Sequence, residues 1–164
     1  MSHRDELIST VKELLGSGTY NSYVFREPSV VEMTFHTPVK VLNKLVEVKE
    51  FLFIGEKDIR CICVMPFSVK EESKRPLAAE YLSRVNWYMR TGWFSMDHSD
   101  GEVRANAERI HTDSLPTAED FKTLVMTPVS LASQYMSGLI LTIQGVGSPK
   151  ENAERFTPDA LKST

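Results

Sequence analysis

The sequence predicts an α+β fold: one antiparallel sheet of about five strands with three helices, in the order α-β-β-β-α-β-β-α. Two observations carry this prediction. Segments with apolar residues at a 3–4 spacing alternate with segments rich in β-branched and aromatic residues. Short turns join neighbouring strands, which favours antiparallel pairing. The length of 164 residues suits one domain.

The first half of the chain predicts one helix and then three strands. Residues 4–15 form the helix, whose apolar face is Leu7, Ile8, Val11, Leu14 and Leu15. The stretch 20–41 is rich in Tyr, Val, Phe and Thr but contains two prolines, which favours short strands. Residues 45–54 and 59–65 form two more strands around a tight turn. The second of these has Cys61 and Cys63 on one face and apolar residues on the other, so we expect it near the centre of the sheet.

The second half predicts a helix, a hairpin and a last helix. The helix spans about residues 75–90, with Pro76 in its first turn, and lies between the third and fourth strands. The turn 97–101 ends in Asp-Gly and joins two short strands. Thr117 and Asp120 resemble a capping box before the last helix. Residues 146–164 lack an apolar period, so we expect residues 1–145 as the domain and 146–164 as a flexible C-terminal tail.

Charge and cysteine content exclude several classes of protein. The formal net charge of -3 argues against a dedicated nucleic-acid binder. Two closely spaced cysteines are too few to staple a secreted fold, and the polar start shows no signal peptide, so we expect a cytoplasmic protein. A charge-free run from Thr123 to Pro149 is long enough to span a bilayer. Its apolar residues lie on one side, which favours a core helix; membrane association through this helix remains an alternative.

No group of residues has the spacing that catalysis or metal binding requires. Cys61 and Cys63 share a strand face without a second ligand pair, so we expect them to be buried, reduced and without metal. His98-Ser99-Asp100 contains the residue types of a catalytic triad, but neighbours in a tight turn point in different directions. Gly145-Val146-Gly147 follows a helix, which does not suit a phosphate site. We expect no catalytic residues, no metal and no cofactor.

Trp87 is the residue that most suggests a binding role. It projects nearly opposite the buried face of its predicted helix, on a charged face. Tryptophan and arginine are enriched at interface hot spots. Two interpretations are open. Either this face is a protein-binding or dimer interface, or residues 20–44 of the same chain cover the indole. The interface would contain Glu80, Arg84, Trp87 and Arg90.

Several segments, in order and spacing, resemble the YbjN-type bacterial family over roughly residues 45–145. They are Val64–Phe67, Lys74–Pro76, Ala79–Trp87, Gly92–Asp97, Asp100–Arg104 and Tyr135–Leu139. The resemblance implies a fold like that of the type III secretion chaperones, which dimerise and bind extended segments of partner proteins. Members are often described as sensory-transduction regulators. The resemblance supplies no catalytic residues, and a shared fold does not establish chaperone activity.

We therefore expect a non-enzymatic, chaperone-like or regulatory protein-binding module that acts as a dimer. Its expected partners are a second copy of itself and an unidentified protein, with neither nucleic acid nor membrane. The alternative is a small-molecule-binding or enzymatic domain whose site is assembled from residues distant in sequence.

Overall fold

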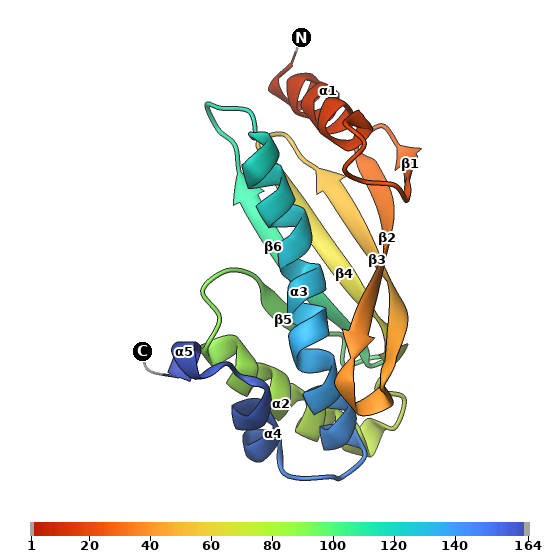
Figure 1. The fold of residues 1–164 in the computed structure, drawn as a ribbon, viewed down its shortest axis with the longest axis vertical. Coiled ribbons are helices and arrows are strands. Elements are labelled where there is room, and N and C mark those ends of the chain that lie inside the picture. Colours follow the sequence, from red (N-terminus) through yellow and green to blue (C-terminus); the bar gives the residue numbers. More distant parts are fainter. Residues whose placement is uncertain (1, 163–164) are drawn as a thin grey trace.

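The computed structural model describes residues 2–162, in which one sheet carries its helices on a single face (Figure 1). The first half comprises α1 (His3–Gly16), β1 (Tyr23–Glu27), β2 (Val30–Val39), β3 (Lys44–Ile54) and β4 (Asp58–Ser68). The second half comprises α2 (Arg75–Trp87), β5 (Trp93–Met96), β6 (Glu102–Ile110), α3 (Ala118–Ile143), α4 (Pro149–Phe156) and α5 (Asp159–Lys162). Short 3-10 turns lie at Lys40–Leu42 and Glu72–Lys74. All neighbouring strands are antiparallel, in the order β1-β2-β3-β4-β6-β5.

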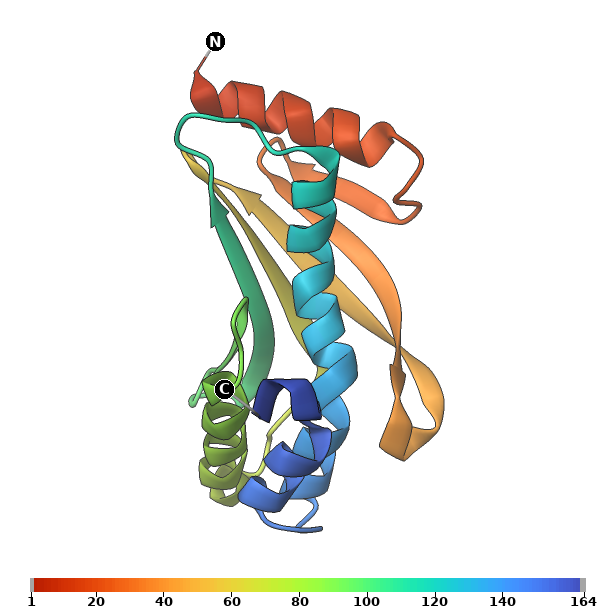
Figure 2. The ribbon, with the colours of Figure 1, turned by 60° about the vertical axis from the view of Figure 1, so that its left-hand side comes forward.

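The helices divide the core into two parts. α3 runs along the sheet, α1 lies across one end of it, and α2 and α4 pack together at the other end (Figure 2). At the α1 end, Leu7, Val11 and Leu15 are fully buried with residues of β2, β3 and β4, as their helical spacing predicts. At the other end, Tyr81 of α2 donates a hydrogen bond of 2.8 Å from its hydroxyl to the Tyr135 carbonyl of α3. This contact ties α2 to α3 inside the second part of the core.

The predicted α+β class and antiparallel sheet are confirmed, but the sheet has six strands rather than about five. The stretch 20–41 forms two strands, because Pro28 falls in the turn between β1 and β2. Pro38 is accommodated inside β2 because β1 pairs with β2 only from Val30 to Met33. The rest of β2 is an open edge on that side, where a missing backbone donor costs little.

The segment 146–164 differs from the flexible tail that we expected. It forms α4 and α5 as far as Lys162, giving five helices rather than three. Ser148 caps α4, and its side chain and that of Glu151 form a reciprocal capping box. Ala153 and Phe156 are buried against α2 and α3, which explains why this short helix is stable.

α3 is the one helix within residues 2–162 that is long and apolar enough to cross a membrane. In the structure, 61% of its most apolar stretch is buried. Its inward residues, among them Phe121, Val125 and Ala132, belong to both parts of the core. This burial is that of a core helix and agrees with the one-sided apolar pattern.

Candidate protein-binding surface

Trp87 is the last residue of α2, and its side chain stands in solvent. The apolar face of α2 is buried as predicted, with Tyr81 and Val85 fully inaccessible. Trp87 in contrast is 85% exposed, more than any other large apolar residue described. Residues 20–44 do not cover it. The interpretation that the same chain buries this indole is therefore wrong.

Arg84 lies one turn and Glu80 two turns before Trp87 on the same side of α2. Their side chains are joined by an ion pair of 2.8 Å and are each roughly half exposed. An exposed i,i+4 pair contributes only about 0.3–0.5 kcal/mol to folding. The pair thus adds little to stability but places both charges in a defined position beside the indole.

A hollow of about 110 Å³ lies beside Trp87, between α2 and α4. Its walls are Arg84, Trp87, Tyr88, Lys150, Ala153 and Glu154. Lys150 and Glu154 are 3.9 Å apart on α4 and form a second i,i+4 pair. The α4 residues were missed because we expected no helix there. The Ser148-Pro149-Lys150-Glu151 sequence, typical of a helix start, could have revealed it.

Arg90 does not join the other three predicted interface residues. α2 ends at Trp87 instead of continuing to residue 90, so Arg90 lies in the turn after the helix. The Asn86 side chain pairs with the Phe94 backbone, accepting from its N–H at 2.8 Å and donating to its carbonyl at 3.0 Å. The chain must therefore turn back toward α2 immediately. Arg90 lines a different groove, next to Thr91, Gly92 and Trp93.

One carboxyl group is buried on the face of the sheet that the helices cover. Glu50 of β3 is inaccessible, and neither of its carboxyl oxygens has a hydrogen-bond partner of normal geometry among the described residues. Burial raises the pKa of Glu50 well above its ordinary value, and the Cys61 thiol beside it lowers that pKa only in part. We missed this residue, although Val48, Glu50, Leu52 and Ile54 are every second residue of β3 and therefore share its inward face.

On β4, Cys63 lies directly opposite Glu50 and Cys61 lies opposite Leu52, and the predicted burial of both cysteines is confirmed. Both are free thiols. Burial raises the pKa of Cys63 to about 12, and burial together with Glu50 raises the pKa of Cys61 well above its usual range. Neutral thiols are poor nucleophiles and poor metal ligands. Within residues 2–162, no three His, Cys, Asp or Glu side chains are grouped as a metal site requires.

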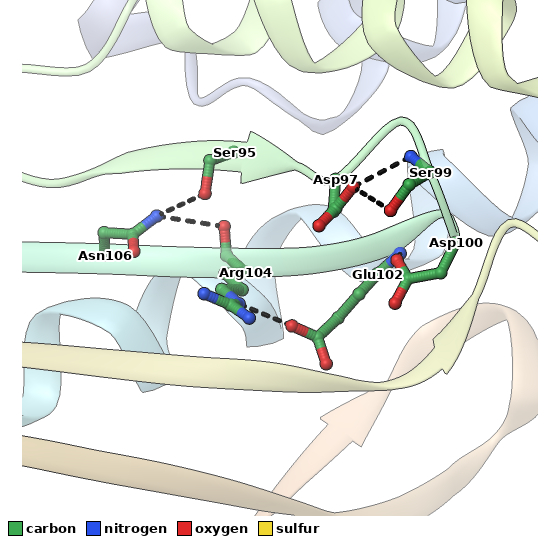
Figure 3. Close-up of polar contacts among 7 residues, drawn as sticks. All are labelled: Ser95, Asp97, Ser99, Asp100, Glu102, Arg104 and Asn106. Atoms are coloured by element: carbon green, nitrogen blue, oxygen red, sulfur yellow. Dashed lines mark hydrogen bonds and ion pairs between the residues drawn. The ribbon is translucent and has the colours of Figure 1, made fainter.

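The hairpin turn between β5 and β6 shows no activated serine (Figure 3). Asp97 Oδ1 accepts hydrogen bonds from the Ser99 N–H at 2.8 Å and from the Ser99 hydroxyl at 2.6 Å. These bonds lower the pKa of Asp97. Asp100 Oδ1 accepts from the Glu102 N–H at 2.8 Å. The polar residues of this turn stabilise the hairpin, as predicted, and the Ser99 hydroxyl is committed to an aspartate rather than to His98.

No known family model matches the chain, and no curated protein sequence is significantly similar to it. The resemblance to the YbjN-type family and the chaperone-like fold therefore stay predictions.

Proposed function

We propose that the protein is a non-enzymatic protein-binding module, chaperone-like or regulatory in type, that acts in the cytoplasm as a homodimer. The single observation that carries the proposal is the 85% exposure of Trp87 beside a hollow between α2 and α4. A large apolar side chain that its own chain leaves in water favours association with another surface. The resemblance to the YbjN-type family, which implies a fold like that of dimeric, segment-binding chaperones, supports the same function.

An indole that projects next to a hollow suits a dimer with two-fold symmetry. In an isologous dimer each patch meets a copy of itself, so a projection requires a matching hollow on the same patch. Trp87 of one copy then packs over Ala153 of its mate. The rim carries both signs of charge, Glu80 and Glu154 with Arg84 and Lys150, so the rotation can bring unlike charges together.

The area of the Trp87 indole that a dimer would cover is sufficient for measurable association. A tryptophan side chain has about 150–250 Å² of surface, and 85% of this is about 130–210 Å². At about 25 cal/mol per Å², its burial contributes about 3–5 kcal/mol for each copy before the entropy cost of association.

Trp87→Ala tests the proposal. We expect light scattering to show a wild-type mass near twice the 18.6 kDa of the chain and a variant mass near that of one chain. Circular dichroism should show that the variant stays folded, because Trp87 packs against little of its own chain. Trp93→Ala is the matched control, since Trp93 is 40% exposed on β5, away from the hollow. A monomeric wild type at high concentration, or an unfolded variant, contradicts the proposal.

A further inference from the structure

One edge of the sheet is left open where β6 extends beyond β5. β5 pairs with β6 only from Met96 with Val103 to Trp93 with Asn106. Gly92, at φ +74°, then turns the chain away from β6, and a Cβ on Gly92 would lie 2.7 Å from the Asn106 carbonyl oxygen. β6 continues to Ile110 without a neighbour on this side, as its upper end shows in Figure 1.

The hydrogen-bonding groups of this open edge can be assigned from the ladder. The His111 N–H donates to the Lys57 carbonyl on the β4 side, whereas the Glu102 carbonyl accepts from Asp97 on the β5 side. In an antiparallel strand the backbone N–H and C=O groups of successive residues point to opposite sides. The N–H and C=O groups of the even-numbered residues of β6 therefore point away from β4. Glu108 and Ile110 therefore present their N–H and C=O groups to the open side. No other backbone hydrogen bond reaches these groups within residues 2–162.

The outer edge of β5 is closed, in contrast. There the side chain of Asn86 satisfies both the N–H and the C=O of Phe94. The side chain of Asn86 thus occupies the hydrogen-bonding edge of β5, whereas no group of the described chain occupies the edge of β6 at Glu108 and Ile110. Ile110 and Trp93, which flank the free edge, are 72% and 40% exposed.

A groove of about 370 Å³ runs between this edge and the first half of α3. Ala107 contributes only a methyl group, which leaves space under Leu124 and Thr127 for an inserted side chain. Arg90 lines the same groove, is exposed and forms no ion pair with a residue of the described chain. Arg109, the other cation of the groove, is paired with Asp120 at 2.9 Å. The groove thus offers an apolar slot and one unpaired positive charge.

We propose that the open edge of β6 accepts an extended segment of a partner protein as an added strand. Backbone hydrogen bonds to Glu108 and Ile110 hold the segment, an aliphatic side chain enters the slot over Ala107, and an acidic side chain meets Arg90. The inference rests on the proposed protein-binding function but uses a surface separate from the Trp87 hollow. It names the class of partner as a β-forming segment with an acidic residue.

A library of random nine-residue peptides displayed on phage is the probe, selected against the purified wild-type protein. Glu108→Pro removes an N–H group that points to the open edge, and it leaves the hydrogen bonds between β6 and β4 intact. Glu108→Ala removes only the side chain. Selected peptides should bind Glu108→Pro at least tenfold more weakly and Glu108→Ala within about twofold of wild type, because only the proline leaves a backbone partner unsatisfied. Arg90→Glu should bind the same peptides more weakly than wild type does. It should bind more tightly those peptides in which the acidic residue is replaced by lysine.

Peptides that bind wild type and Glu108→Pro equally, or a selection that yields no binding peptide, would overturn the inference. A change in the protein's own mass in Glu108→Pro without peptide would assign the edge to a second copy and also overturn it. The Trp87→Ala monomer is tested with the same peptides. Peptide binding that survives in this monomer separates the edge from the dimer, so either proposal can fail alone.

Discussion

Replacing Glu50 with glutamine should change how the stability of the protein depends on pH. The carboxyl group is inaccessible among Cys61, Cys63 and Met33, and its pKa is raised chiefly by burial. A raised pKa means that the folded state keeps its proton at pH values where the unfolded chain has lost it. The contribution of Glu50 is therefore most favourable below its ordinary pKa of 4.5 and is lost as the pH rises toward the folded-state value.

The size of the effect follows from proton linkage. While Glu50 is protonated in the folded state and ionised in the unfolded state, the free energy of unfolding falls by about 1.4 kcal/mol for each pH unit. At full slope this amounts to about 2.7 kcal/mol over two pH units, a large part of a typical domain's stability. The Glu50→Gln variant keeps the shape of the side chain and removes the titrating proton.

Urea unfolding of wild type and Glu50→Gln at pH 5, 6 and 7, at one protein concentration and ionic strength, measures the difference. We expect the variant to gain stability relative to wild type at each step upward in pH. Glu27→Gln is the control for the loss of one carboxylate, since Glu27 is exposed at the end of β1 and forms no ion pair with a residue of the described chain. Parallel pH profiles for wild type and Glu50→Gln would refute the reasoning.

Two further predictions concern the packed interior. Gly138→Ala should lower the free energy of unfolding by about 1–3 kcal/mol, because the added Cβ would overlap the Tyr81 hydroxyl and lie 2.7 Å from the Phe156 ring. Gly16→Ala meets no atom within 4 Å and should cost nothing; equal urea midpoints for the two variants would argue against this packing. Cys61 and Cys63 should react with a thiol reagent only after unfolding, since both are fully buried; rapid reaction of the native protein would contradict their placement.

The strands were predictable where one face of the sheet is buried. Alternation in β3 and β4 requires inward and outward positions, and the structure places Val48, Leu52 and Cys61 inward as that pattern predicts. The same pattern also assigns Glu50 inward, although we did not single it out from the sequence, since a carboxyl group is rarely buried without a partner. Burial raises the pKa of Glu50, which favours the neutral carboxyl group that an apolar interior tolerates better than a carboxylate.

The surface around Trp87 was only half predictable. The helical period placed Trp87, Glu80 and Arg84 together, because residues at these spacings share a side of a helix. The same period could not show that α2 ends at Trp87, since that end depends on the pairing of Asn86 with the β5 backbone. The hollow also needs α4, whose stability comes from tertiary burial of Ala153 and Phe156 more than from its own apolar pattern.

Tryptophan fluorescence of Trp93→Phe tests the central claim most directly, because Trp87 is then the single tryptophan of the chain. A dimer through the Trp87 hollow predicts emission from a buried indole at high protein concentration. On dilution the emission should shift to that of a water-exposed indole, over the same range in which the mass falls to one chain. Water-exposed emission at every concentration, whether the protein is a monomer or a dimer, would contradict the account.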